Sequence, residues 1–270
     1  MLILVMTFLI YILLGIFAGT LSGIFGIGGG LVIVPTLLFC FKLLDFPSAY
    51  IMHMTIGTSL GIILVTVSNS MYGHHLNKNI DWAIVKKIVL FLLIGAFTGS
   101  FVSKDLATDT LELIFAAYVV IVSIKMFLEV KIERDLRETS SVLYSIVGFI
   151  IGFKSTILGI GGGTISIPFL TWRGQPMKVA VGVSATLGIP IALAGATSYM
   201  YNGYGISELP KYSLGYVYLP AVVGVTLTSS FFARIGAKLS HRLPQDKMKK
   251  GFAIFLMIVA VKMIYQIIKK

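Results

Sequence analysis

The sequence predicts an all-α polytopic membrane protein with about ten hydrophobic segments, arranged as two inverted five-helix repeats with Gly-rich broken helices. Of its 270 residues, 57% are apolar and 12% are charged, whereas an ordinary soluble domain has about 25% charged residues. A spanning helix needs about 20 apolar residues, so ten of them occupy roughly 200 positions. The composition therefore leaves no room for a sizeable soluble domain.

Each apolar run is bounded by Gly, Pro or charged residues, and we interpret it as one membrane segment. The first five runs cover residues 2–25, 31–44, 50–72, 82–103 and 111–130. The second five cover residues 141–158, 164–173, 179–201, 213–233 and 248–268. We expect a transmembrane repeat over residues 1–130, a polar connector over 131–140 and a second transmembrane repeat over 141–270.

The two halves share motifs in the same order, which indicates an internal duplication. Gly26-Ile27-Gly28-Gly29-Gly30 is followed by Pro35, and 133 positions later Gly159-Ile160-Gly161-Gly162-Gly163 is followed by Pro168. Thr58-Ser59-Leu60-Gly61 similarly returns as Ala185-Thr186-Leu187-Gly188.

Loop charges indicate how the repeats lie in the membrane. Each repeat has five segments, which is an odd number, so the second repeat enters the membrane from the side opposite to the first. The side away from the N-terminus carries fifteen Lys and Arg against seven on the N-terminal side, which makes it cytoplasmic by the positive-inside rule. We expect both termini outside, although the basic pair Lys269-Lys270 argues against this. If the short second segments were re-entrant hairpins, there would instead be eight spans and parallel repeats.

The two glycine-rich stretches predict a cavity at membrane depth. Glycines at this density unwind a helix, and free backbone groups are tolerated there only when buried in protein or lining a cavity. Helix resumes from Leu31 and Thr164, so N–H groups and positive helix ends would attract an anion. The alternative is that the glycines only let helices pack closely.

Lys154 lies inside the sixth run, where its counterpart in the first repeat is Leu21. A charge inside a span is costly and indicates a functional site; the alternative is a long side chain extending to the interface. Hydroxyl residues also follow the breaks in both halves. The candidate substrate-binding residues are Gly26, Gly28, Gly29, Gly30, Thr58, Ser59, Lys154, Gly159, Gly161, Gly162, Gly163, Ser184 and Thr186.

Charge and residue pattern argue against several other functions. The net charge is +11, but the basic residues are scattered singly between apolar runs, which favours membrane-flanking loops over a nucleic-acid surface. The histidines have no partners at metal spacing, so we expect no metal and no cofactor. All eleven acidic residues fall in loops or at helix ends, so we expect no buried carboxylate for proton relay or catalysis. The protein is therefore not expected to be an enzyme.

The glycine motifs also carry a family resemblance. Gly23 to Gly30 with Pro35, repeated at Gly159 to Pro168 and followed by the Thr58-Ser59 and Ala185-Thr186 segments, resembles the sulfite exporter TauE/SafE family over nearly the whole chain. The resemblance implies a multi-pass transporter of the bacterial inner membrane for small sulfur-containing anions: sulfite, sulfonates or related organosulfonates.

We therefore expect an anion held near the membrane midplane between the two breaks, with access alternating between the two sides. An anion channel and a membrane-embedded enzyme or assembly subunit without transport are the alternatives. The lipid bilayer is an expected partner and nucleic acid is not. The anion, the direction of transport, the coupling ion and the formation of a homodimer stay open.

Overall fold

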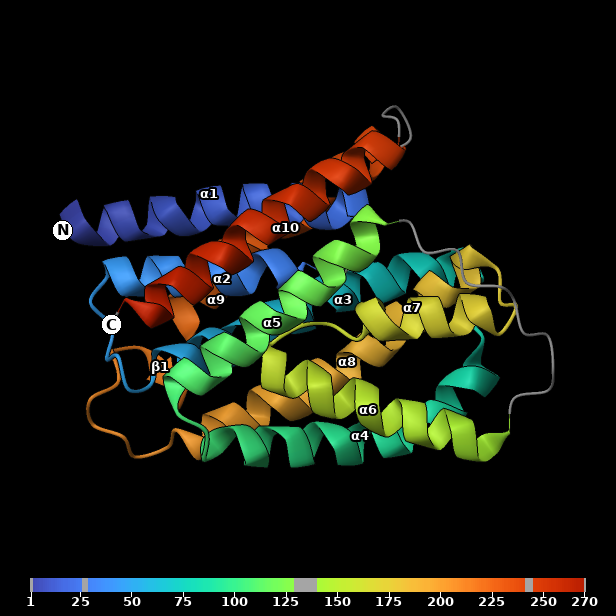
Figure 1. Ribbon diagram of the computed structural model, residues 1–270, viewed down its shortest axis with the longest axis horizontal. Helices are drawn as coiled ribbons and strands as arrows, with labels where there is room; N and C mark the ends of the chain where they lie inside the picture. Colours follow the sequence, from blue (N-terminus) through green and yellow to red (C-terminus); the bar gives the residue numbers. More distant parts are fainter. Residues whose placement is uncertain (1, 26–28, 129–139, 241–244, 270) are drawn as a thin grey trace.

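Ten α-helices and one two-stranded hairpin make up the computed structural model, which describes residues 2–25, 29–128, 140–240 and 245–269 (Figure 1). The helices of the first half are α1 (Leu2–Phe25), α2 (Gly30–Leu43), α3 (Ile51–Leu76), α4 (Trp82–Lys104) and α5 (Thr108–Phe127). Those of the second half are α6 (Ser141–Leu158), α7 (Gly163–Trp172), α8 (Met177–Asn202), α9 (Leu219–Ser240) and α10 (Gln245–Ile268). Most of the predicted connector lies outside the described residues.

The ninth segment differs from its prediction. Helix was expected from residue 213, but the chain forms the short antiparallel strands β1 (Ser213–Leu214) and β2 (Val217–Tyr218) before α9 begins. Gly215 makes the turn with a φ of 52°, a left-handed conformation that glycine adopts without steric cost. An apolar run alone does not reveal this turn, because hairpin and helix both bury such residues.

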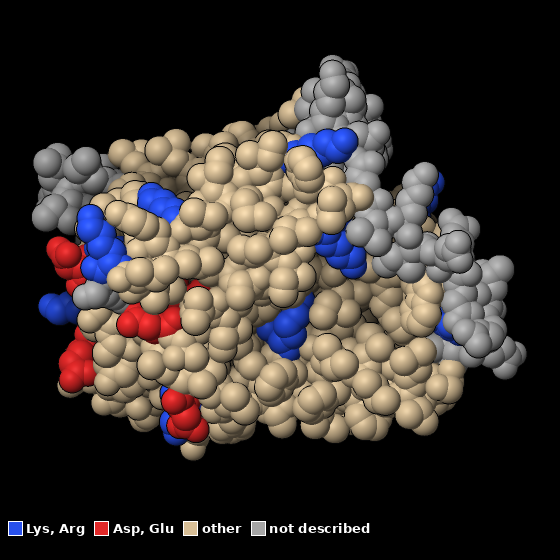
Figure 2. All heavy atoms as spheres, viewed as in Figure 1, with Lys and Arg blue, Asp and Glu red and all other residues tan. Residues whose placement is uncertain are grey.

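Within the described residues, six helices are long and apolar enough to cross a membrane: α3, α4, α5, α6, α8 and the Lys250–Ile268 part of α10. Shorter apolar helices lie at Phe8–Leu21, Gly30–Leu43 and Leu219–Ala233. In Figure 2 the acidic residues visible on this face gather towards one end, and the broad middle is tan apart from isolated basic residues. The chain is therefore a multi-pass, all-α membrane protein, as predicted.

The helices pack in pairs that relate the two halves. α1 packs along α9, α4 along α6, α3 along α8 and α5 along α10. If each helix is replaced by its counterpart in the other half, so that α1 becomes α6 and α9 becomes α4, the α1–α9 pair becomes the α6–α4 pair. The same exchange leaves the α3–α8 and α5–α10 pairs unchanged. Figure 1 shows that α1 begins and α10 ends at the same end of the molecule.

Glycines bring these paired helices into close contact. A Cβ on Gly19 of α1 would lie 2.6 Å from the Cα of Ser229 in α9, and a Cβ on Gly148 of α6 would lie 2.7 Å from the carbonyl oxygen of Ile88 in α4. Atoms this close would have to move, so larger residues are excluded here. Small residues of this kind let helix backbones approach each other in membranes.

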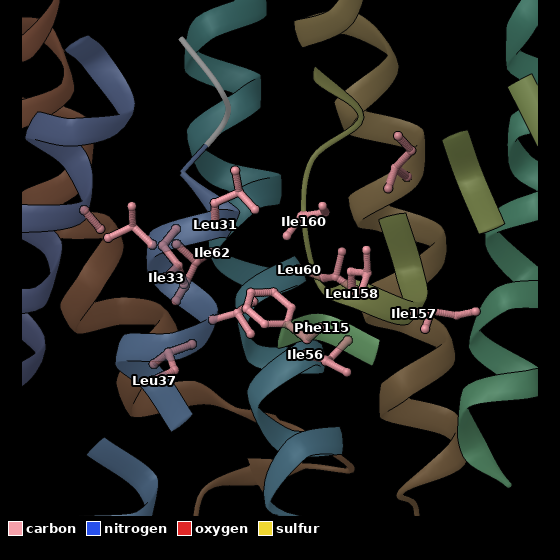
Figure 3. Packing of buried hydrophobic residues seen from close by; sticks show 14 of the residues in the cluster. Leu31, Ile33, Leu37, Ile56, Leu60, Ile62, Phe115, Ile157, Leu158 and Ile160 are labelled. Atoms are coloured by element: carbon pink, nitrogen blue, oxygen red, sulfur yellow. The ribbon is translucent and has the colours of Figure 1, made fainter. Parts of the chain in front are cut away.

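The central pair, α3 and α8, runs in opposite directions. Gly57 of α3 lies against Tyr199 near the end of α8, while Val67 of α3 lies against Gly188 near its middle. The core around this pair is apolar, and Figure 3 shows Phe115 of α5 packed near Ile56 and Leu60 of α3. The two short helices α2 and α7 also pack against this pair.

Candidate functional site

The first helix break separates α1 from α2. Residues 26–28, which include the predicted site residues Gly26 and Gly28, lie outside the described part of the chain. Gly29 has a φ of 73°, and its carbonyl accepts hydrogen bonds from the amides of Val32 and Ile33. Its left-handed conformation favours glycine, and it sets the direction in which α2 begins.

The second break lies between α6 and α7. Helix α6 ends at Leu158, and Gly159 follows in a left-handed conformation with a φ of 64°. Gly162 is the N-cap of α7, and its carbonyl accepts from the amide of Ser166. The first amides of a helix have no partner within it, so the N-terminus of α7 presents unpaired N–H groups. Helix is therefore interrupted at the predicted place.

The two breaks touch each other inside the protein. A Cβ on Gly30 would lie 2.7 Å from the Cα of Ile160, so a side chain there would push the breaks apart. The hydroxyl of Ser59 donates to the carbonyl of Gly159 over 2.7 Å and holds the second break against α3. Figure 3 shows Leu31, at the start of α2, beside Ile160 in the second break.

Both breaks line one cavity of about 380 Å³. Gly29 contributes from the first break, and Gly161, Gly162 and Gly163 contribute from the second. The cavity extends along the C-terminal half of α3 as far as His74. Among the described residues that line it, none is Lys, Arg, Asp or Glu. Its polar surface therefore consists of backbone groups, hydroxyls, the amide of Asn69 and one imidazole.

The predicted hydroxyl residues divide into two groups. Ser184 lines the cavity and accepts a hydrogen bond from Ser166 over 2.8 Å. Thr58 instead accepts from the amide of Tyr218, and Thr186 donates to the carbonyl one turn before it, at Gly182. With Ser59 bonded to the second break, these three side chains lie in the surrounding structure and not among the lining residues.

The structure adds a hydroxyl that the sequence did not suggest. Ser229 of α9 lines the cavity and is 2% exposed, and its Oγ has no hydrogen-bond partner in the part of the chain that the structure describes. Buried hydroxyls normally have a partner. At the same cavity, the Asn69 amide donates to Ser230 over 3.2 Å and links α3 to α9.

Lys154 lies behind the cavity wall and is not among the lining residues. Its ammonium donates to the hydroxyl of Thr164 over 2.7 Å and to that of Tyr118 over 2.9 Å, and it lies over the Tyr118 ring. Thr164 directly follows Gly163, so the charge is attached to the first turn of α7. In the described part of the chain, Lys154 pairs with no carboxylate.

Aromatic side chains fill the end of the molecule opposite the part of the cavity at His74. Tyr216 of the hairpin lies against His53 and Tyr50, and Tyr218 packs edge-on against Phe41. Burial and the neighbouring Tyr50 raise the pKa of Tyr216, so its hydroxyl stays neutral. In this conformation the hairpin covers the ends of α3 and α8.

One acidic residue contradicts its prediction. Glu112 was expected at a helix end outside any core, but its side chain is fully buried, at 0% exposure, in α5. Its Oε1 lies 2.9 Å from the ammonium of Lys42, while its Oε2 has no hydrogen-bond partner within the described ranges. Helix α5 begins at Thr108, three residues before the predicted segment, which brings Glu112 into the helix body.

Comparison with known proteins gives a consistent family. The family model described as "Sulfite exporter TauE/SafE" matches residues 11–263. A probable membrane transporter protein of Haemophilus influenzae is 41% identical over 257 residues, covering 94% of this chain and 97% of the relative. A probable membrane transporter protein of Methanocaldococcus jannaschii is 27% identical over 256 residues, covering 94% of each chain. The family and these relatives are described as membrane transporters and not as enzymes.

Proposed function

Because the chain belongs to the sulfite exporter TauE/SafE family, we propose that it carries a small sulfur-containing anion across the bacterial inner membrane. The cavity shared by the two glycine breaks is the observation that supports this most. Helix N-termini and free amides favour anions. Ser184 and Ser229 line the same cavity, and in this proposal their hydroxyls donate hydrogen bonds to the anion.

The size of the cavity favours an organosulfonate over sulfite itself. About 380 Å³ compares with about 30 Å³ for one water in the liquid, so an inorganic oxyanion leaves most of the space empty. The non-glycine wall includes apolar side chains such as Ala18, Ile33 and Val181. In our proposal the sulfonate oxygens bind the amides and hydroxyls, and a short carbon chain contacts the apolar wall.

The proposed topology is two inverted five-helix repeats. Support comes from α3 and α8, which occupy the same place in the two halves and run antiparallel. The described loop that follows this end of α3, where the cavity reaches His74, carries Lys78. The positive-inside rule makes this end cytoplasmic and leaves both termini outside. Access then alternates as the cytoplasmic opening closes and the aromatic side chains around the hairpin separate.

Lys154 takes the role of a positioning charge in this proposal. It is bonded to Thr164 in the first turn of α7, so its positive charge adds to the field of the helix N-terminus without touching the anion. A bound anion compensates a charge that has no carboxylate partner in the described residues.

Counterflow in proteoliposomes tests the function. Vesicles loaded with unlabelled 2-hydroxyethanesulfonate should accumulate the labelled anion transiently, because a carrier exchanges substrate whereas an open channel does not. Ala185→Trp fills the cavity and should abolish counterflow. Leu193→Trp on the same helix, where the side chain is 51% exposed at the surface, should leave it intact. The proposal fails if labelled sulfonate and sulfite both show no counterflow, or if Ala185→Trp transports normally.

A further inference from the structure

Glu112 and Lys42 form a buried ion pair at the end of the molecule away from the cavity. Glu112 is fully buried, whereas the Lys42 side chain is 28% exposed. Among the residues that the structure describes, only one carboxylate oxygen is paired: Oε1 accepts from Lys42, and Oε2 has no partner. A buried carboxylate with an unpaired oxygen is costly, and that oxygen is a ready acceptor for a proton.

The ion pair holds the helix that begins at the cavity. Lys42 lies in the last turn of α2 and bonds both Glu112 of α5 and Gln266 of α10, the latter over 3.2 Å. The other end of α2 is Gly30, which contacts the second break and directly follows the cavity residue Gly29. One rigid helix of 14 residues therefore connects the substrate cavity to the ion pair.

The remaining charged and titratable groups near this pair have other contacts. On α10, Lys262 lies over the ring of Phe39. On α3, the His53 ring nitrogen Nε2 bonds to the carbonyl of Ser103, while its Nδ1 is buried without a partner among the described residues.

Two further charged side chains also have contacts of their own. On α6, Lys154 bonds to Tyr118 and Thr164. On α5 itself, Asp109 has a partner of its own. Among the described residues, Lys42 is therefore the cation in contact with Glu112.

Resting on the proposed transport function, we infer that Glu112 is a proton-binding site that couples anion transport to the proton gradient. A proton from water at this end adds to Oε2, and the carboxylate becomes neutral. The ion pair with Lys42 then opens, and the partly exposed ammonium turns towards water with its own proton retained. Helix α2 is freed from α5 and α10, and the same proton leaves Glu112 when the pair forms again.

Cys40 is a natural reporter of this step, since it is the single cysteine of the chain, lies in α2 two residues before Lys42 and is 3% exposed. Labelling by a maleimide requires the thiolate, so its chemistry alone slows as pH falls. In the wild type we expect the labelling rate per thiolate to be higher at the acidic end of a pH series than at its neutral end, because protonation of Glu112 frees α2. Glu112→Gln should label rapidly at both, with only the chemical slowing left.

Two further variants complete the labelling test. Cys40 should also be labelled rapidly in Lys42→Gln, because this variant removes the other partner of the ion pair. It replaces Glu112→Gln in the test if Glu112→Gln does not fold. Lys42→Arg keeps the charge and should behave as the wild type. The inference is wrong if the pH dependence of labelling in the wild type matches that of the folded Glu112→Gln and Lys42→Gln proteins.

Transport gives a second, separate readout. Glu112→Gln should keep sulfonate counterflow at equal pH on both sides, but lose the accumulation that a pH gradient drives in the wild type. Accumulation by Glu112→Gln at the wild-type level would contradict the inference. If the wild type itself shows no counterflow, the proposed function fails, while the labelling experiment still decides whether Glu112 controls α2.

Discussion

Replacing Ser229 by Ala should weaken anion binding and at the same time leave the fold as stable or more stable. Ser229 is 2% exposed, and its buried Oγ has no hydrogen-bond partner among the described residues. A hydrogen bond to a charged group contributes about 1.5–3 kcal/mol. Since 1.4 kcal/mol is a factor of ten in affinity, we expect Kd for 2-hydroxyethanesulfonate to rise roughly 10- to 100-fold.

Stability should change in the opposite direction. An unsatisfied buried polar group costs about 1–3 kcal/mol, and Ser229→Ala removes it with little change of shape. The free protein should therefore unfold at an equal or higher temperature than the wild type. Opposite signs for affinity and stability separate loss of a ligand contact from general damage to the fold.

Ser155→Ala is the matched control. The Ser155 Oγ is also fully buried and unpartnered, but the residue does not line the cavity. It should share the stability effect and keep the wild-type Kd. Titration calorimetry and thermal unfolding in lipid nanodiscs measure both quantities. Wild-type affinity in Ser229→Ala, or equal loss in both variants, would refute the reasoning.

Two other substitutions test the break and the charge behind it. Gly30→Ala should abolish transport, because the new Cβ would lie 2.7 Å from the backbone of Ile160 and disrupt the contact between the breaks. Gly251→Ala has open space around it and should transport normally. Equal transport by the two variants would contradict the geometry. Lys154→Met should raise Kd for the sulfonate about tenfold, since a nearby unit charge contributes roughly 1–2 kcal/mol at an effective dielectric constant near 20. Lys154→Arg should stay near the wild type, and unchanged binding by Lys154→Met would remove the charge from the account.

Helix positions and breaks could be predicted because membrane helices follow apolar length directly. Segment 141–158 matches α6 residue for residue, and the described glycines Gly29 and Gly159 lie outside helix at the expected places. The hairpin before α9 could not be predicted in this way. Its turn depends on the backbone conformation of Gly215, which hydropathy does not record.

The site could be predicted only in part, because repeat symmetry identified the glycines but not every hydroxyl. Ser229 was missed because it lies outside the shared motifs from which the candidate residues were chosen. Thr58 and Thr186 do match in place, yet their hydroxyls bond to backbone groups. Which of several hydroxyls remains free depends on neighbours distant in the chain.

Glu112 illustrates the same difficulty for charges. Its burial depends on Lys42, 70 residues earlier, and on a helix start three residues before the predicted one. Neither fact is visible in the local sequence. The consequence is large, because a chain expected to lack a buried carboxylate contains one that holds α2.

The central claim is that an oxyanion binds where the two glycine breaks meet. A structure determined with 2-bromoethanesulfonate, with the bromine located by its anomalous scattering, tests it most directly. We predict the sulfonate against the amides of Gly161 to Gly163 near Gly29, with the Ser229 hydroxyl in contact. An occupied site elsewhere on the protein, with this cavity empty at saturating ligand, would contradict the claim.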